Sequence, residues 1–208
     1  MLTGERVGLR AIERADLSQL LAWRNNPAMR RFFREYRELG MDQQLRWYEQ
    51  TVLGDPSTRM FAIVELEGNR SPGRLLGACG LCYIHAANRS ADFSIYLGAD
   101  GLYIDEAFAP DAARTLMRYG FDELNLHRLW AEIYDNDAPK RAFFDALGFR
   151  LDGTQRQTTW RGGRWHDSLF FSMLEPEYRA MHDAGLAPEE RFLVDCVGDP
   201  ATRSEQRR

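Results

Sequence analysis

Alternating apolar and polar residues predict a series of short strands in the first half of the chain. Residues 5–11 place Val7 and Leu9 between polar neighbours, as a strand with one buried face does. Three later segments have strand-forming residues and are separated by turns containing Gly, Pro or Asn: residues 61–65, 75–84 and 92–97. Because short turns join them, we expect these three segments to form successive antiparallel strands.

Apolar residues at helical spacing predict helices around these strands. Residues 16–24 form one such segment, and we expect the chain to leave the helix just before Pro27. A second helix covers residues 43–52, with Asp42 as its N-terminal cap. Between the two lies the Arg-rich segment 29–37, which we expect to be either a short helix or a mobile cover over the site.

A helix, a strand and a second helix are predicted within residues 103–149, and the rest of the chain is arranged around this run. The first helix begins at residues 109–111, and residues 129–134 alternate as a strand. In the second helix Pro139 fits the first turn and Gly148 lies just past the end, where a left-handed cap needs no Cβ. Two further strands are expected near residues 150–159 and 166–173.

Length and charge narrow the class of protein. A chain of 208 residues with 44% hydrophobic residues is large enough for one domain with a full core. We expect that domain to cover residues 1–175, followed by a C-terminal extension, residues 176–208, that is helical and then flexible. A net charge of −4 argues against nucleic-acid binding. With no apolar run of about eighteen residues and no signal peptide, we expect a cytoplasmic protein outside the membrane.

Cysteine and lysine are both scarce. Cys79, Cys82 and Cys196 do not make a disulfide framework. Cys79 and Cys82 have the spacing of a zinc or redox pair, but residues three apart on a strand face opposite sides and no second ligand pair exists, so we expect no metal. Lys140 is the only lysine, so a site that needs an ammonium group has one candidate.

Several motifs, in their order along residues 2–174, resemble the GNAT N-acetyltransferase superfamily in its RimJ/RimL-like branch. The closing half carries Phe-Asp-Glu-Leu-Asn-Leu-His-Arg at 121–128, Asp-Asn-Asp at 135–137 and Phe-Phe-Asp-Ala-Leu-Gly-Phe at 143–149. The hairpin sequence at 161–167, Asp152-Gly153, Leu9-Arg10 and Trp23-Arg24-Asn25 extend the likeness. The resemblance implies an α/β (α+β) fold with a mixed, mostly antiparallel central sheet flanked by helices.

The resemblance also implies an acyl-CoA-dependent N-acyltransferase. Such an enzyme transfers an acetyl group from acetyl-CoA to a primary amine by direct attack in a ternary complex, without a metal. The acceptor is either a protein N-terminus or a small amine, such as an aminosugar nucleotide. A homodimer is a further possibility. On the acceptor side the candidates are Trp23, Arg24, Tyr36 and Trp47. An equally good interpretation is that they are core aromatics and solvated arginines without a role in binding.

For the cofactor, the resemblance implies that strands 90–97 and 129–134 splay apart. Backbone groups of Tyr96 and Leu97 would hold the pantetheine, and the diphosphate would lie on the helix N-terminus near residue 109. The family's loop pattern falls on residues 104–109, where Asp105 and Glu106 add repulsion and Ile104 replaces a basic or amide residue. The predicted cofactor contacts are completed by Ala107, Phe108, Ala109, Arg114, Asn136, Lys140 and Phe144.

For catalysis, Asp92 and Glu132 are the candidate bases that take the amine proton. Phe144 stands where many relatives have a tyrosine acid, so Lys140, Tyr134 and Tyr103 are the candidate donors to the thiolate. The competing interpretation makes both carboxylates solvent-facing and Lys140 an exposed helix charge. Because of the altered loop, a non-catalytic GNAT-like binding or regulatory domain is the rival function, and a different acyl donor is a third hypothesis.

Overall fold

The computed structural model describes residues 1–183. Contacts divide the chain into two compact units, Met1–Glu175 and Pro176–Arg208. The first unit holds the sheet, five α-helices and short 3-10 and π-helical turns, and α6 (Glu175–Asp183) begins at its last residue. The predicted flexible tail beyond residue 183 and Cys196 lie outside the described residues. Within residues 1–183, no helix is long and apolar enough to cross a membrane.

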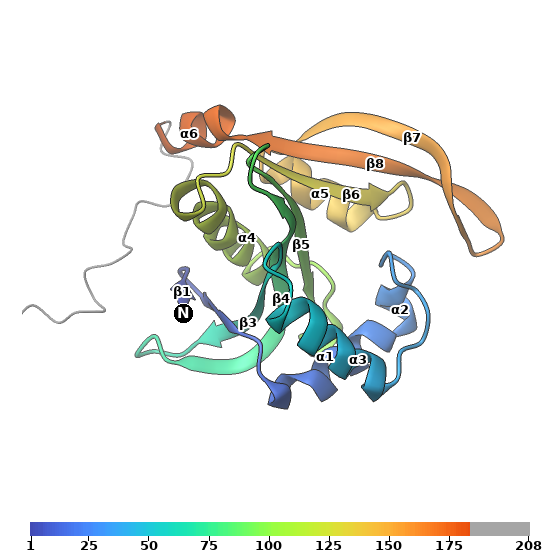
Figure 1. Cartoon of the computed structure of the whole chain (residues 1–208), viewed down its shortest axis with the longest axis horizontal. Coiled ribbons are helices and arrows are strands. Elements are labelled where there is room, and N and C mark those ends of the chain that lie inside the picture. The colour runs from blue at the N-terminus through green and yellow to red at the C-terminus, as the bar shows by residue number, and fades with distance from the viewer. Residues whose placement is uncertain (184–208) are drawn as a thin grey trace, which may run out of the picture. The chain divides into compact units, whose positions relative to one another are not determined.

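One eight-stranded sheet forms the centre of the first unit (Figure 1). Its strands are β1 (Leu2–Thr3), β2 (Val7–Ala11), β3 (Arg59–Leu66), β4 (Pro72–His85), β5 (Ser90–Leu97), β6 (Arg128–Tyr134), β7 (Arg150–Arg161) and β8 (Arg164–Leu174). The order across the sheet is β1-β2-β3-β4-β5-β6-β8-β7. Only β5 and β6 run parallel, and every other neighbouring pair is antiparallel. The predicted mixed, mostly antiparallel sheet is confirmed.

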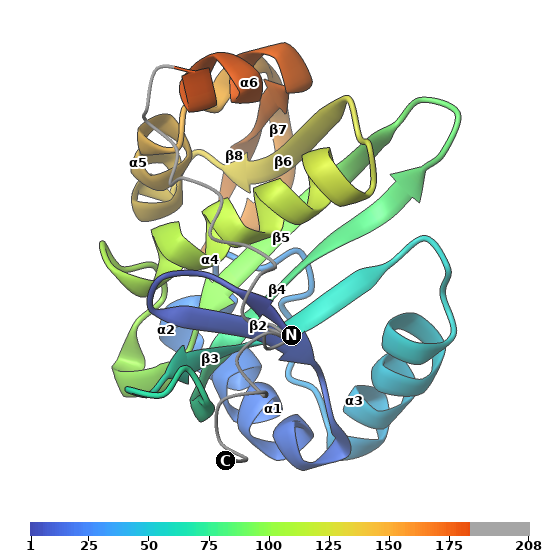
Figure 2. The same cartoon turned by 90° about the vertical axis from the view of Figure 1, so that its left-hand side faces the viewer.

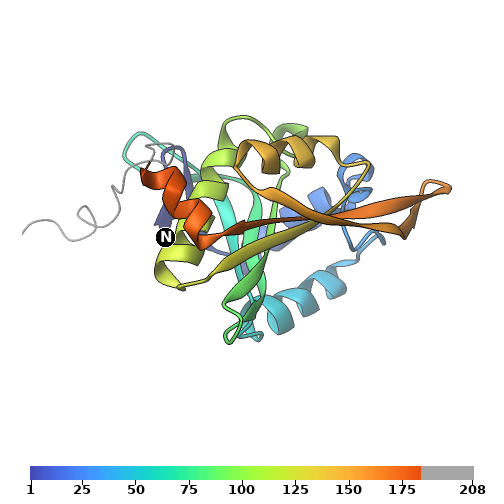
Figure 3. The same ribbon diagram turned by 90° about the horizontal axis from the view of Figure 1, so that it is seen from above.

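Helices cover both faces of this sheet. They are α1 (Leu17–Asn25), α2 (Pro27–Arg30), α3 (Met41–Trp47), α4 (Phe108–Arg118) and α5 (Ala138–Ala146). In Figure 2, α4 crosses the sheet next to β4 and β5. In Figure 3, α5 and α3 lie on opposite sides of the sheet. Gly148 has a φ of 85° just past α5, as its predicted role in a left-handed cap requires.

The predicted cap of α3 is wrong. The helix begins at Met41 with Gly40 as its N-cap, and Asp42 is an exposed residue of the first turn. The Gln43 side chain accepts a hydrogen bond from the backbone N–H of Gly40 at 2.8 Å. A side chain three residues into the helix therefore satisfies the free amide, and no capping carboxylate is needed.

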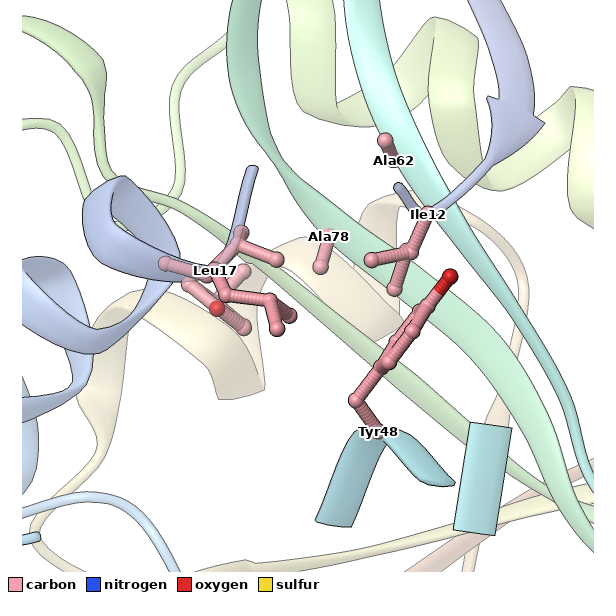
Figure 4. Close-up of a cluster of buried hydrophobic side chains, with 7 residues drawn as sticks. Ile12, Leu17, Tyr48, Ala62 and Ala78 are labelled. Atoms are coloured by element: carbon pink, nitrogen blue, oxygen red, sulfur yellow. The ribbon is translucent and has the colours of Figure 1, made fainter. Parts of the chain in front are cut away.

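Two apolar clusters fill the space between helices and sheet. On the face of α1 and α3, Leu17 and Tyr48 approach the small side chains of Ala62 and Ala78 (Figure 4). On the other face, the ring of Phe144 is fully buried against four further phenylalanines: Phe93, Phe143, Phe149 and Phe171. Both clusters lie beside β5, so this strand is held rigidly from both sides.

A buried carboxylate joins α4 to the start of the sheet. Asp111, in the first turn of α4, accepts backbone hydrogen bonds from Glu5, Arg6 and Val7 at 3.0, 2.7 and 2.9 Å. A Cβ at Gly4 would lie 2.6 Å from both carboxylate oxygens of Asp111, so this close approach needs a glycine. One side chain therefore fixes both the first turn of α4 and the turn before β2.

We expect Asp111→Asn to lower the free energy of unfolding by about 3 kcal/mol, because an amide nitrogen would face N–H donors that are left without an acceptor. Urea unfolding measures this loss. Asp42→Asn is the matched control, since Asp42 also lies in a first helical turn but is exposed. Its expected change is below about 1 kcal/mol. Equal stability of the two variants would contradict the role given to Asp111.

Candidate active site

The two parallel strands at the centre of the sheet pair over only part of their length. Hydrogen-bonded register joins Ser90 to Arg128, Ala91 to Leu129 and Asp92 to Trp130. Beyond Asp92, β5 continues to Leu97 and β6 to Tyr134 without pairing to each other. The predicted splay is confirmed, and it leaves one backbone edge of β5 without a neighbouring strand.

Two carboxylates and one guanidinium meet where the strands separate. Arg34 Nη1 lies 2.5 Å from Asp92 Oδ2, and Arg34 Nε lies 3.1 Å from Glu132 Oε2. The Asp92 side chain is 5% exposed and the Glu132 side chain 22%. Burial raises the pKa of Asp92, although Arg34 and Lys140 oppose that shift. The two candidate bases are thus brought together, and an arginine bridges them.

Lys140 lies close to this group, at the start of α5. Its ammonium is 5.4 Å from the centre of the Tyr103 ring, and the Tyr103 hydroxyl donates to Asp137 at 2.7 Å. Asp137 also caps α5 by accepting from the Lys140 amide. Burial lowers the pKa of Lys140, and burial with the neighbouring Asp137 raises the pKa of Tyr103 well above its usual value. Lys140 is therefore half-buried rather than a free surface charge.

The segment that follows α2, residues 31–37, covers the separated strands. The ring of Phe32 stacks on Tyr103 at 5.0 Å between centres, and the ring of Phe33 meets Tyr96 edge-on at 5.2 Å. Arg161, near the tip of the β7–β8 hairpin, donates to the carbonyls of Phe33 and Arg34. Of the two alternatives predicted for the Arg-rich region, the short helix α2 ends at Arg30 and the residues after it form the cover.

The N-terminus of α4 is already capped by an acidic side chain. Asp105 accepts hydrogen bonds from the backbone N–H groups of Phe108 and Ala109 at 3.1 and 2.7 Å. Ala107 is the N-cap residue of the helix, and Glu106 is exposed. The sequence suggested that Asp105 would only repel a diphosphate, whereas the structure places its carboxylate on the amides themselves. An incoming phosphate would have to displace that carboxylate.

The remaining cofactor candidates lie in different surroundings. Asn136 has a buried Oδ1 with no partner among the described residues, so it can accept a hydrogen bond from a ligand. The Leu97 N–H donates to the Tyr103 carbonyl at 2.9 Å, so that group is already engaged. Arg114 is exposed on α4. Phe144 has no exposed surface, so its ring, as placed, cannot touch a ligand.

Tyr96 and Tyr134, the other two candidates on the separated strands, are both buried. The Tyr96 ring belongs to the apolar cluster under α1, and burial raises its pKa to about 12. The guanidinium of Arg161 lies 5.6 Å from the centre of the Tyr134 ring. Tyr134 therefore stands under the hairpin arginine that also holds the 31–37 segment.

The four acceptor-side candidates are divided between core and surface. Trp23 lies on the backbone at the end of β5, because a Cβ at Gly98 would fall 2.0 Å from its ring. Arg24 lies over the Phe33 ring, and Tyr36 is 56% exposed under the guanidinium of Arg161. Trp47 packs against the apolar cluster of α1 and α3. Tyr36 is thus part of the cover, Arg24 adjoins it, and Trp47 supports the core.

Two arginines of the site were not singled out from the sequence. Arg34 lies 58 residues from its partner Asp92, and Arg161 lies 127 residues from Arg34. The signals were the arginine-rich composition of segment 29–37 for Arg34 and the hairpin sequence at 161–167 for Arg161, and neither says where the side chain points. Among residues 1–183, no cluster of three or more His, Cys, Asp or Glu side chains could hold a metal ion.

Comparison with known proteins identifies the family. A family model described as an acetyltransferase (GNAT) domain matches residues 6–150, more than half of the chain. The uncharacterized N-acetyltransferase p20 of Bacillus licheniformis is 25% identical over 176 residues, which cover 84% of this chain and 96% of that protein. The spermidine N(1)-acetyltransferase of Escherichia coli K12 is 26% identical over 182 residues, covering 88% and 93%.

A solved structure agrees in fold. The crystal structure of the spermidine N-acetyltransferase of Vibrio cholerae, in complex with CoA and spermine, matches with a TM-score of 0.73 at 23% identity, over 84% of this chain and 98% of that one. The chain belongs to the GNAT acetyltransferase family, as its motifs predicted. This membership supports acetyl-CoA-dependent N-acetylation of an amine as the function. The RimJ/RimL-like branch stays a prediction.

Proposed function

We propose that this chain transfers an acetyl group from acetyl-CoA to the primary amine of a small, cationic acceptor. The observation that carries the proposal is the pair of carboxylates, Asp92 and Glu132, at the point where β5 and β6 separate. A protonated amine is attracted to such a pair, and a buried carboxylate is a strong enough base to take its proton. The similarity to spermidine N-acetyltransferases supports a small alkylamine over a protein N-terminus.

The reaction is a direct transfer. The amine nitrogen, once neutral, attacks the thioester carbonyl carbon, the C–S bond breaks, and the sulfur leaves as a thiolate that takes a proton. Asp92, whose pKa burial raises, is the first candidate to accept the ammonium proton, with Glu132 as the alternative. Lys140, whose pKa burial lowers, is a stronger acid than an ordinary lysine and is the candidate that protonates the thiolate.

The residues around the separated strands fit acetyl-CoA in part. The β5 edge beyond Asp92 and the Oδ1 of Asn136, which has no partner among residues 1–183, offer hydrogen-bonding groups for the pantetheine. The amides at the start of α4 suit a diphosphate only after Asp105 moves. We therefore expect measurable but weak CoA binding.

The cytoplasmic location and the homodimer stay predictions from the sequence.

Thiol release from acetyl-CoA tests the proposal. The purified chain is supplied with acetyl-CoA and, in separate reactions, a diamine, a monoamine, an aminosugar nucleotide and a peptide with a free N-terminus. The expected result is amine-dependent CoA release that is fastest with the diamine. Release with the peptide alone would replace the proposed acceptor, and CoA binding without release for any amine would favour the non-catalytic rival.

A further inference from the structure

The guanidinium of Arg34 occupies the opening between the two candidate bases. It contacts Asp92 on β5 through Nη1 and Glu132 on β6 through Nε. Asp92 is the last residue of β5 that pairs with β6, so the guanidinium lies at the point of separation. Its charged end also lies 5.8 Å from the centre of the Trp130 ring. The cation is thus surrounded by two carboxylates and an aromatic face, the surroundings that a bound ammonium also prefers.

The carboxylates need a cation in this position. Both are largely withdrawn from water, and two neighbouring anions without a partner would be costly there. Glu132 keeps one further contact, because its Oε1 accepts from the Ser168 hydroxyl at 2.6 Å. Glu132 Oε2 and Asp92 Oδ2 both contact Arg34, and Lys140 adds a second positive charge near Asp92. A guanidinium from the chain and an ammonium from an acceptor cannot fill the same space, so the two compete.

Arg34 is attached in a way that lets its side chain leave. It extends from the 31–37 segment rather than from a helix or strand, and its side chain is 41% exposed. The backbone around it is held separately, by Phe32 on Tyr103 and by Arg161 on the carbonyls of residues 33 and 34. Rotation of the long side chain into solvent therefore does not require the cover to unfold.

We propose that the space between Asp92 and Glu132 is a subsite for a protonated amine, and that Arg34 is its internal competitor. This inference rests on the proposed function and specifies its acceptor. An acceptor must carry a positive charge to exchange with Arg34, because a neutral one would leave two buried anions unpaired. Arg34 thereby acts as a specificity-determining residue that excludes uncharged acceptors and lowers the apparent affinity for charged ones.

The test measures the binding of 1,4-diaminobutane to Arg34→Met by calorimetry, in the absence of acetyl-CoA. Met keeps the length of the stem and removes the cation. We expect the affinity to rise at least tenfold over that of the unaltered chain, and to return toward the original value when Asp92→Asn is added. Arg34→Lys, which keeps a cation, should bind like the unaltered chain.

Arg37→Met is the matched control. Arg37 belongs to the same segment, but it is exposed and pairs with Glu35 of that segment, with Nη2 to Oε2 at 2.5 Å. Its loss should leave diamine affinity within twofold. If Arg34→Met is unstable alone, millimolar diamine should restore its melting temperature, since a ligand that binds the folded state stabilises it. Absence of that recovery counts against the proposal, as does unchanged affinity in a folded Arg34→Met.

Binding and turnover separate the two proposals. Diamine binding needs no acyl donor, so an affinity gain in Arg34→Met without thiol release in any variant would support the subsite and overturn the acetyl transfer. Thiol release with unchanged diamine affinity in Arg34→Met would do the reverse. A gain of equal size for 1-butanol, which carries no charge, would also overturn the subsite, because it would show that space and not charge was freed.

Discussion

Replacing Asp92 by Asn is expected to lower kcat for acetyl transfer by roughly a hundredfold to ten-thousandfold, the range that a general base contributes. Asn has nearly the same shape, so the packing around residue 92 is kept, but its amide cannot accept the ammonium proton. Arg34 loses one ion pair and retains the contact with Glu132. The measurement is thiol release at saturating acetyl-CoA and amine, with circular dichroism to show that the variant is folded.

The pH dependence of kcat gives a second observable for the same variant. Because burial raises the pKa of Asp92, its carboxylate is protonated at a higher pH than that of an ordinary aspartate. A base must be deprotonated to act, so kcat of the unaltered chain should fall as the pH falls through that raised pKa. In Asp92→Asn this acid limb should be absent.

Asp152→Asn is the matched control for Asp92. Asp152 is a half-exposed sheet carboxylate that pairs with Arg128 at 2.6 Å, outside the group formed by Arg34 and its two partners. Its kcat should stay within twofold of the original. Glu132→Gln distinguishes the two carboxylates of the site. If it removes the acid limb while Asp92→Asn keeps both the limb and the rate, then Glu132 is the base and Asp92 is not.

Replacing Asp105 by Ala is expected to tighten CoA binding about thirtyfold. The capping hydrogen bonds to Phe108 and Ala109 contribute about 1 kcal/mol to the free form, and they must be given up when a phosphate takes the same amides. Removing the negative charge relieves repulsion of about 1 kcal/mol more. Together these effects amount to about 2 kcal/mol, or roughly thirtyfold in Kd. Calorimetry with CoA measures the change.

Pantetheine is the control ligand for Asp105→Ala, because it lacks the diphosphate. Its affinity should be unchanged, whereas that of CoA rises. Asp105→Asn removes the charge but keeps an oxygen for capping, so its CoA affinity should lie between those of the unaltered chain and Asp105→Ala. Glu106→Ala should have a small effect, since the Glu106 side chain is exposed and no hydrogen bond to the helix is seen for it within residues 1–183. A gain for pantetheine equal to that for CoA would refute competition at the helix N-terminus.

The sheet and its separated strands could be predicted because they follow from local pattern and from motifs along the chain. Alternation predicted β2 to β5, and the GNAT resemblance predicted that β5 and β6 splay apart, which they do beyond Asp92. The errors arose where several side chains compete for one backbone group. At the start of α3, Gln43 satisfies the free amide, so Asp42 has nothing to cap.

The arrangement of charges in the site could not be predicted from the sequence for a related reason. Asp105 was expected to act through repulsion, but a short acidic side chain preceding a helix can also turn back onto its amides. Arg34 is one of several arginines in its segment, and only folding shows which one reaches Asp92. The sequence therefore predicted the carboxylates of the site and not the cation that they hold.

The scarcity of lysine has a practical consequence. Of the 27 Lys and Arg residues, 26 are Arg, and the single Lys140 is half-buried beside Tyr103 and Asp137. Guanidinium groups stay protonated and resist acylation, so a protein that handles reactive thioesters has a single side-chain amine, that of Lys140, open to stray acylation. Apart from the N-terminal amine, an amine-directed reagent has only Lys140 to label, beside the separated strands. The rate of Lys140 labelling would then report on whether a ligand lies beside the separated strands.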